Sequence, residues 1–503
     1  MTSQQRWTLA ATILGSAMAF IDTTVINVAL PVMQTELRAG VDDAQWIINS
    51  YLLLLSALIL AGGSLGDRLG RVRVFGFGVL TFAAASIWCG AAPGAMSLIA
   101  ARALQGFGAA LLVPGSLAII NETFRREERG RAIGTWSALT SLAIIAGPLL
   151  GGFLVQSISW RAVFYINAPI AAVVLWAVWR HVPPSKREDR GAIDWLGTLL
   201  VTFGLGAVTY ALIEHRFAVA IAGVIALIAF VFVQRRVANP IVPLSLFRSR
   251  SFSAANVLTL LLYAALSAAT FLLPFNLIQV QGYSPAAAGA AFLPFVATMS
   301  LLSRWTGALA DRIGPRLPLI VGPLVAAAGF ALLAWPSIGG SYWTTFFPGV
   351  LTLGIGMSIT VAPLTTTVMT SIEDERYSGA ASGINNAVAR AAGLLSIAAF
   401  GAVAVFVFAR QLDHNLRDAP PAVRQAMRVE AIRLADARPP AGADPATKAR
   451  VQQAVKHSFV SAFRVNVLIA GLLAALSALG GAMVRRRDDH AGGDGLQGEQ
   501  HHR

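Results

Sequence analysis

The stretch at residues 63–73 reads GSLGDRLGRVR, and a shortened copy, GALADRIGPR, stands at residues 307–316. Five positions recur at the same spacing: Gly63, Leu65, Asp67, Arg68 and Gly70 match Gly307, Leu309, Asp311, Arg312 and Gly314. Each copy lies in a short charged break that follows a long apolar run. Such a recurrence indicates a duplicated membrane protein with parallel repeats.

The composition around these copies is that of a membrane protein. The 503 residues are 56% hydrophobic and only 13% charged, against roughly 25% charged in an ordinary soluble domain. The net charge of +14 does not indicate a nucleic-acid partner, because the basic residues fall in short breaks between apolar runs rather than on one face of a domain. The single cysteine, Cys89, excludes internal disulfides and cysteine-ligated metal sites, and we expect no cofactor.

Apolar runs long enough to cross a bilayer recur along the chain. A helix needs about 20 residues to cross the hydrocarbon core, and fourteen runs reach that length, although soft ends leave twelve or thirteen open. They lie near residues 8–30, 45–66, 74–92, 96–121, 133–156, 163–180, 194–213, 217–233, 252–275, 286–310, 317–336, 342–366, 379–409 and 459–483. The first run is too long for a signal peptide and contains Asp22, so we interpret it as a span.

The basic residues gather in alternate breaks between the spans, and cytoplasmic loops carry such an excess. These residues are Arg68, Arg71, Arg73, Arg125, Arg126, Arg129, Arg131, Lys186, Arg187, Arg190, Arg235, Arg236, Arg248, Arg250, Arg312, Arg316, Arg376, Arg485, Arg486 and Arg487. The other short breaks hold only Arg38, Arg161 and Arg216. We therefore expect both termini in the cytoplasm. Arginine outnumbers lysine 36 to 3, which is typical of a GC-rich bacterium, so the expected location is a bacterial inner membrane.

The loop at 410–458 is the weakest point of this orientation. It lies on the outer side, yet it carries nine Lys or Arg and five acidic residues. It is predicted to form two amphipathic helices broken by Pro439 and Pro440, with Asp444 as the N-cap of the second.

The repeat also predicts the domain organisation of an all-α polytopic membrane protein. The copies are 244 residues apart, from Gly63 to Gly307, which is too far for six helices. Two helices inserted near 194–233 explain the offset. We expect a six-helix bundle at 1–193, inserted helices and a cytoplasmic loop at 194–251, a second six-helix bundle at 252–484, and a disordered cytoplasmic tail at 485–503.

Residues 63–73 resemble the signature loop of the major facilitator superfamily, which lies between the second and third helices. The glycines allow close helix approach, and Asp67 can pair with Arg71 four residues later. The resemblance implies a cytoplasmic latch made of Gly63, Asp67, Arg68, Gly70 and Arg71, with Asp311 and Arg312 in the second copy. The alternative is an ordinary charged turn.

Residues 98–110, LIAARALQGFGAA, place Arg102 inside a span. A charge there costs a few kcal/mol, so it needs a partner or a cavity. The stretch resembles the fourth-helix motif of the superfamily, and the resemblance links Arg102 to proton coupling, with Gln105 beside it. The alternative is an arginine that reaches the outer surface.

Residues 134–152 carry small residues at spacings that make a flat packing face. They resemble the fifth-helix motif of the superfamily's antiporters, with Ala143 in place of a glycine, and this favours export over uptake. The alternative is generic helix packing. The motif residues are Gly134, Gly147, Pro148, Gly151 and Gly152.

Residues 21–31, IDTTVINVALP, resemble the first-helix motif of fourteen-helix drug:proton antiporters of the EmrB/QacA type. At 1.5 Å per residue, Asp22 lies about 8 Å from the outer face of a core about 30 Å thick, and Arg102 about 9 Å from it. We hypothesise that the two side chains are close in one state, so that protonation of Asp22 weakens their attraction. The alternative is a structural Asp22 acting with Asn27.

Three weaker matches complete the resemblance. Residues 160–169, WRAVFYINAP, resemble the junction of the fifth and sixth helices in the same branch. Asn386, Arg390 and Gly393 resemble a motif of the penultimate helix, and Arg390 sits near mid-membrane, where a functional role is expected. We count Asn27, Gln105, Asn386 and Arg390 as possible cavity residues. Arg304 is expected to reach the cytoplasmic surface.

The resulting functional hypothesis is a proton-coupled antiporter that exports small lipophilic compounds by alternating access, works as a monomer and is not an enzyme. A membrane-embedded enzyme would need paired acids or a zinc site at membrane depth. No deep acid other than Asp22 is present, so neutral, monocationic or amphiphilic substrates are expected. An uptake symporter, or an exporter of one metabolite or antibiotic, stays open as an alternative.

Overall fold

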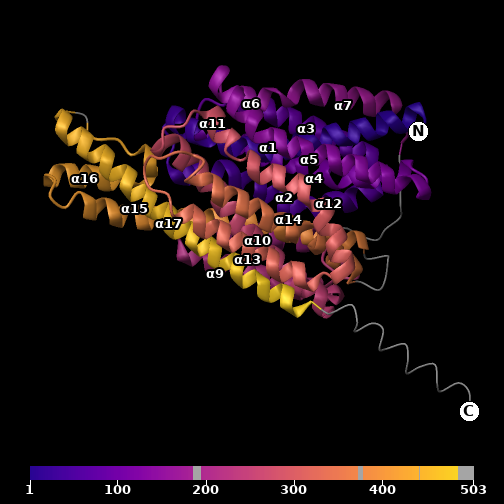
Figure 1. The fold of residues 1–503 in the computed structure, drawn as a ribbon. Helices are drawn as coiled ribbons and strands as arrows, with labels where there is room; N and C mark the ends of the chain where they lie inside the picture. Colours follow the sequence, from indigo (N-terminus) through magenta and orange to yellow (C-terminus); the bar gives the residue numbers. More distant parts are fainter. Residues whose placement is uncertain (185–193, 372–377, 441, 485–503) are drawn as a thin grey trace, which may run out of the picture.

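The computed structural model describes residues 1–184, 194–371, 378–440 and 442–484, and these residues form helices without a strand (Figure 1). Long helices run side by side along an elongated bundle, and a helical extension projects from one end of it. The expectations for Lys186, Arg187, Arg190, Arg376 and the tail at 485–503 lie outside the described residues.

The first half of the chain contributes seven helices, of which α6 and α7 together form one crossing. They are α1 (Ser3–Leu37), α2 (Val41–Leu69), α3 (Arg71–Ala91), α4 (Ala95–Thr123), α5 (Arg126–Ser157), α6 (Ala162–Tyr165) and α7 (Asn167–His181). Two further helices, α8 (Trp195–Ile213) and α9 (Phe217–Gln234), pack on each other. The α8–α9 pair is tied at its base, where buried Asp194 caps α8 and accepts a hydrogen bond from Gln234 at 2.5 Å.

The second half begins after a short 3₁₀ turn. Its elements are η1 (Leu244–Arg248), α10 (Arg250–Phe275), η2 (Asn276–Val280), α11 (Pro285–Ala290), α12 (Leu293–Ile313), α13 (Arg316–Ala334), α14 (Phe346–Thr370), α15 (Ser378–Asn415), α16 (Pro421–Glu430), η4 (Ala431–Asp436) and α17 (Pro445–Met483). Helix α8 packs against α2 of the first half and against α15 of the second. The division into 1–193, 194–251 and 252–484 stays a prediction.

Thirteen helices in the described part of the chain are long and apolar enough to cross a membrane. The fourteenth expected span, 133–156, lies within α5, where only Leu142–Ser157 forms a shorter apolar helix. Charged residues fill the first turns of α5, and glycines interrupt its apolar part, which lowers its hydropathy although its 32 residues are enough to span. The fourteen expected crossings thus correspond to thirteen helices that are clearly apolar enough to span and to α5, which is less apolar.

The two copies of the repeat occupy matching places in the fold. Gly70 ends α2 with φ +99°, and Gly314 ends α12 with φ +82°. Glycine is suited to both positions because a side chain rarely adopts a positive φ. In each copy the next helix starts within two residues, so the repeat marks the same sharp turn twice.

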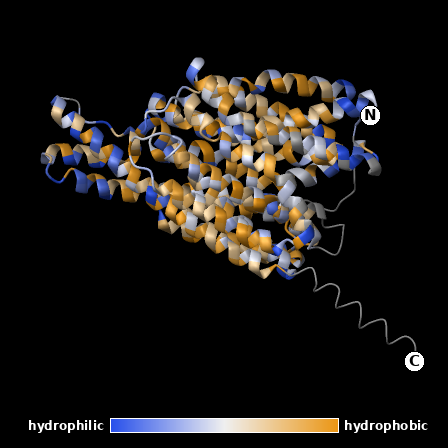
Figure 2. Cartoon of the chain, viewed as in Figure 1, coloured by the Kyte–Doolittle hydropathy of each residue, from blue (hydrophilic) through white to orange (hydrophobic). Residues whose placement is uncertain are grey.

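The segment at 410–458 is mostly helical, as predicted, with a break around Pro439 and Pro440; a further break separates α15 from α16. Helices α15 and α17 have 38 and 39 residues, about twice what a bilayer needs, and with α16 they form the extension in Figure 1, which we call the protrusion. As predicted, Asp444 caps α17 by accepting a hydrogen bond from the Thr447 amide at 2.9 Å. Figure 2 shows hydrophilic residues on the protrusion and hydrophobic ones along the bundle.

Candidate functional site

A buried ion pair joins α1 to α4. The Arg102 Nη1 atom donates to Asp22 Oδ2 at 2.5 Å, and both side chains are 0% exposed. Taking an ion out of water costs several kcal/mol, which only a partner with good geometry offsets. The two residues are 80 positions apart in the sequence, and their contact agrees with the similar depths expected for them from the sequence. Arg102 therefore does not reach the surface, which was the alternative.

Gln105 extends this pair into a network. Its Oε1 accepts from Arg102 Nη1 at 2.7 Å, while its Nε2 donates to Asp22 Oδ1 at 2.8 Å and to Ser86 Oγ at 2.7 Å. Asn167 Nδ2 also donates to the Ser86 hydroxyl, at 3.0 Å. Each Asp22 oxygen thus has a donor, and the network draws on α1, α3, α4 and α7. These bonds join the four helices, while Arg102 Nη2 and Asn167 Oδ1 are buried without a hydrogen-bond partner in the described part of the chain.

The remaining surroundings of Arg102 come mainly from α2. Its Nε donates to the Ile47 carbonyl at 3.0 Å. Its guanidinium carbon lies 4.3 Å from the centre of the Tyr51 ring, and 5.9 Å from that of Phe164. A cation over an aromatic face gains stabilisation, more so without water. Arg102 is thereby held by a carboxylate, an amide, a carbonyl and two rings, and its side chain is fully buried.

The glycines of α5 place that helix directly against α1, beside Asp22. A Cβ at Gly147 would collide with the Thr24 hydroxyl, and one at Gly151 would lie 2.9 Å from a Val25 methyl group. Small residues allow such an approach. Gly134 differs, because nothing lies within 4 Å of a Cβ built there. The packing face of α5 is thus its second half.

The same end of α5 also contacts the second half of the chain. A Cβ at Gly152 would lie 2.5 Å from the Pro285 carbonyl oxygen of α11. Reciprocally, a Cβ at Gly289 of α11 would collide with the Pro148 carbonyl. Helix α5 therefore lies between α1 and α11, so a movement of Asp22 on α1 is adjacent to a contact between the two halves.

The predicted latch residues meet at the opposite end of these helices. Arg71 Nε lies 2.9 Å from Asp67 Oδ1, as the spacing of four predicts, and Arg71 Nη1 lies 3.8 Å from Glu122 at the end of α4. The pair bridges the turn at Gly70 and connects α2, α3 and α4. In the second copy Arg312 is exposed, and the Asp311 side chain lies outside the described residues.

The Major Facilitator Superfamily profile matches residues 12–397 of this sequence, which includes every element described above from α1 to the middle of α15. The chain belongs to the Major Facilitator Superfamily. It is therefore a multi-pass transport protein of the membrane, and its relatives extend the match to both ends of the chain.

Among these relatives is the multidrug resistance protein Stp of Mycobacterium tuberculosis, which is 33% identical over 99% of this chain and 95% of its own. The tetracenomycin C resistance and export protein of Streptomyces glaucescens is 31% identical over 96% and 92%. The puromycin resistance protein pur8 of Streptomyces alboniger is 34% identical over 81% and 84%. A solved bacterial homologue of the human lysosomal transporter Spinster has a TM-score of 0.66 at 18% identity, covering 96% of this chain and 99% of that one, and it shares the superfamily fold.

Within this superfamily member, the possible cavity residues from the sequence fall into different places. Gln105 belongs to the network, whereas Asn27 donates only to the Thr23 carbonyl of its own helix. Asn386 is exposed and donates to the Ser382 carbonyl one turn earlier. Arg390 is partly exposed, and its Nε has no hydrogen-bond partner.

Sequence reasoning missed three residues of the network. Ser86 of α3 and Tyr51 of α2 lie in runs without a motif match. Asn167 of α7 falls in the stretch 160–169 that resembles the family, but its side chain was not singled out. A polar side chain in the middle of an apolar run was the available signal, since such groups seek a partner within the bundle.

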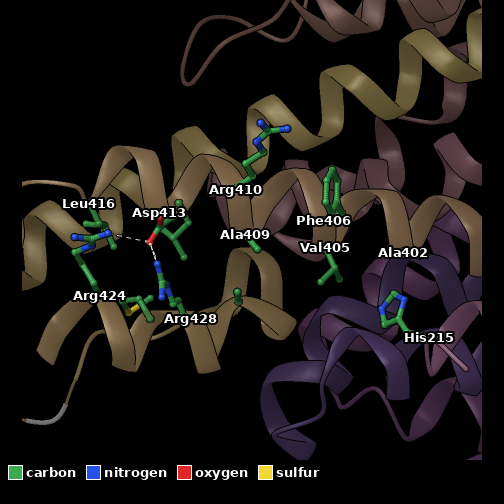
Figure 3. Close-up of a pocket in the computed structure, with 13 residues that line it drawn as sticks. His215, Ala402, Val405, Phe406, Ala409, Arg410, Asp413, Leu416, Arg424 and Arg428 are labelled. Carbon is green, nitrogen blue, oxygen red and sulfur yellow. Dashed lines mark hydrogen bonds and ion pairs between the residues drawn. The ribbon is translucent and has the colours of Figure 1, made fainter. Parts of the chain in front are cut away.

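A further cavity lies away from this network, at the base of the protrusion (Figure 3). It encloses about 670 Å³ between α15, α16 and the α8–α9 turn. Asp413 forms ion pairs there with Arg428 at 2.9 Å and Arg424 at 3.5 Å, and His215 and Phe406 line the other end. The cavity thus combines an apolar floor with a small ionic cluster.

Proposed function

We propose that this protein is an antiporter that exports small lipophilic compounds across the bacterial cytoplasmic membrane in exchange for protons, with both termini in the cytoplasm. It works as a monomer and catalyses no reaction. The observation that carries the proposal is the buried network of Asp22, Arg102 and Gln105. An ionisable pair at this depth is costly to keep and marks an ion pathway.

Proton coupling follows from what protonation does to this pair. With Asp22 ionised, its charge offsets that of Arg102, and α1 stays against α4. When Asp22 takes a proton, the attraction is lost and a buried guanidinium is left without a counter-charge, which is strongly unfavourable. Any state that hydrates Arg102 or gives it another anion then gains population.

The contacts around the pair support a mechanical connection. Asp22 lies within one helical turn of Thr24 and Val25, the α1 residues that pack against Gly147 and Gly151, and α5 in turn contacts α11 at Gly152. A shift of α1 after protonation therefore acts on the junction of the two halves. At the other end, Asp67 and Arg71 act as the cytoplasmic latch. Two six-helix halves, 1–193 and 252–484, rock about the junction, with the segment 194–251 between them.

The direction of transport rests on the family. The relatives carry names of resistance and export proteins, and the Gly147–Pro148 motif is the antiporter type. Two of these names give one compound each, so export of a specific antibiotic is the second candidate. An uptake symporter fits neither the names nor the α5 motif.

The test measures proton release and export with one substitution. In proteoliposomes that hold a pH gradient, the wild type should export drug-like dyes, and purified protein should release protons on binding them. Asp22→Asn should abolish both effects. The control is Glu36→Gln on the same helix, a half-exposed acid paired with Arg161 at 3.6 Å, which should behave as wild type. Unchanged coupling in Asp22→Asn would contradict the proposal.

A further inference from the structure

Arg390 of α15 is a second arginine at membrane depth, and it has no counter-charge. Its Nε atom is buried without a hydrogen-bond partner, and no carboxylate in the described part of the chain forms an ion pair with it. Its depth follows from its neighbours on α2: a Cβ at Gly383 would meet Leu60, and one at Gly393 would lie 3.9 Å from Leu52. Arg390 therefore faces the middle of α2.

This position brings Arg390 close to the Asp22–Arg102 pair from the opposite half of the chain. Tyr51 of α2 connects the two regions: its ring covers Arg102 at 4.3 Å, and the next residue, Leu52, lies against Gly393, one turn of α15 from Arg390. Asp22 is already engaged by Arg102 and Gln105. The region thus holds two guanidinium groups and one carboxylate, an excess of one positive charge.

An uncompensated guanidinium at this depth is unfavourable for folding, so its retention points to a ligand. Arginine presents a planar set of donors that matches carboxylates and other planar anions. We infer that Arg390 binds the acidic group of the exported compound, so that lipophilic organic anions such as carboxylates and phenolates are the preferred substrates. This inference rests on the proposed export function. It differs from the expectation of neutral or monocationic substrates, which came from the scarcity of acidic residues alone.

The energetics of exchange agree with this charge preference. Export of a monoanion and import of one proton together move two positive charges inward, so an inside-negative membrane potential drives the exchange in addition to the pH gradient. Export of a monocation for one proton moves no net charge and gains nothing from the potential. The free cation at Arg390 also repels a cationic substrate. Both effects favour anions.

The experiment compares two dyes that share a xanthene core, fluorescein as the anion and rhodamine 123 as the cation. Proteoliposomes with a pH gradient and an inside-negative potential report initial export rates. The wild type should export fluorescein faster than rhodamine 123. Arg390→Gln should export fluorescein about tenfold or more slowly, because the loss of a hydrogen bond to a charged group weakens binding by at least that factor. The same variant should export rhodamine 123 at least as fast as the wild type.

Two variants separate charge from structure. Arg390→Lys should keep part of the fluorescein rate, because the charge remains and the planar donor set is lost. Arg417→Gln, at an exposed site near the end of the protrusion, should match the wild type. In a thermal unfolding assay, fluorescein should raise the Tm of the wild type but not of Arg390→Gln. The unliganded Arg390→Gln protein should unfold at the same or a higher temperature, because the substitution removes a charge whose Nε atom is buried without a partner.

The outcomes distinguish this inference from the proposed function. Gradient-driven export of rhodamine 123 without export or binding of fluorescein overturns the anion preference and leaves the antiporter intact. Equal fluorescein rates in the wild type and Arg390→Gln overturn the role of Arg390. If neither dye is exported with the gradient while fluorescein still raises the Tm through Arg390, the binding site stands and proton-driven export fails. If no dye shifts the Tm, the inference fails.

Discussion

The network at Asp22 and the cluster at Asp413 are built from the same groups in opposite surroundings. Asp22 and Arg102 are 2.5 Å apart with both side chains 0% exposed. Asp413 and Arg428 are 2.9 Å apart, with 38% and 66% of their side chains exposed. Water solvates the second pair, so its contribution is small, whereas the first pair exchanges hydration for fixed partners.

This contrast indicates that burial, more than geometry, decides which carboxylate can couple to a conformational change. When Asp413 takes a proton, water replaces the lost attraction around Arg424 and Arg428. When Asp22 takes a proton, bulk water cannot reach the fully buried Arg102 to replace the lost attraction. Only a movement of helices can then stabilise the guanidinium. Protonation of an aspartate therefore changes only its immediate surroundings in the protrusion, whereas in the bundle it favours a movement of whole helices. Substitutions at the two sites, and at positions between them, should therefore differ in the size of their effects.

The largest effect is expected for Arg102→Ala. It leaves Asp22 buried without its partner, and breaking a buried pair costs about 3–5 kcal/mol. Export should be lost and the Tm should fall. The double variant Asp22→Asn/Arg102→Gln should recover stability without recovering export. Thermal unfolding of the wild type and the two purified variants measures this, and a double variant less stable than Arg102→Ala would show that the unpaired charge is not the main cause of the lost stability.

Gly147→Leu should come next. The added side chain collides with Thr24 of α1, which separates α5 from α1, and overpacking in a close helix contact typically costs about 1–3 kcal/mol. Export should fall by at least about tenfold, with a smaller loss of stability than for Arg102→Ala. The matched control is Gly134→Ala on the same helix, where the space is open. Equal losses in both variants would remove the α1–α5 contact from the mechanism.

A smaller effect is expected for Gln105→Leu. It removes the amide that bridges Asp22, Arg102 and Ser86 but keeps the ion pair itself. A lost hydrogen bond to a charged group is worth about 1.5–3 kcal/mol, so the proton-release signal should weaken without disappearing. Gln105→Glu adds a second acid to the network and should change the number of protons released. Identical proton release in both variants contradicts the assignment of Gln105 to the coupling network.

The latch variant Asp67→Asn should slow transport by only a few fold, because the Asp67–Arg71 pair is partly exposed and such pairs contribute little. The effect should appear in the transport rate rather than in substrate affinity, as the latch lies at the far end of the helices from Asp22. A changed affinity with an unchanged rate would move this pair from the latch to the binding site.

Asp413→Asn should have the smallest effect, below about twofold in rate and with no change in proton release, as expected for a solvated pair. Its comparison with Asp22→Asn is the direct test of the contrast between the two sites. A loss of proton release in Asp413→Asn would abolish that contrast.

Much of this organisation follows from the sequence, and the reasons are physical. Apolar length determines the spans, and the repeated Gly-Asp-Arg motif identifies the duplicated turns at Gly70 and Gly314. Residue counting placed Asp22 and Arg102 at one depth, because the rise of a helix is constant. Depth is the coordinate that a sequence gives well in a bundle of helices.

The sequence predicts poorly which way each helix is rotated about its own axis. Ser86, Asn167 and Tyr51 face the network because of how α3, α7 and α2 are turned, and uniformly apolar helices show no preferred face. The assignment of Asn27 to a cavity stays a prediction, since its amide donates to the Thr23 carbonyl of its own helix and its side chain is partly exposed. The continuation of α15 into the protrusion was also missed, since a charged segment indicates the end of a span but not the end of a helix.

The length of α15 has a consequence for watching this protein at work. Its 38 residues make a rod about 57 Å long, of which the bilayer holds about half. A rotation of about 10° around mid-membrane, an illustrative angle of roughly the size seen in rigid-body switches, would sweep the outer tip through several ångströms. The tip of the protrusion therefore moves further than the helices within the bilayer. Fluorophores placed at Arg417 and His215 would report each transport cycle as a change in the distance between them.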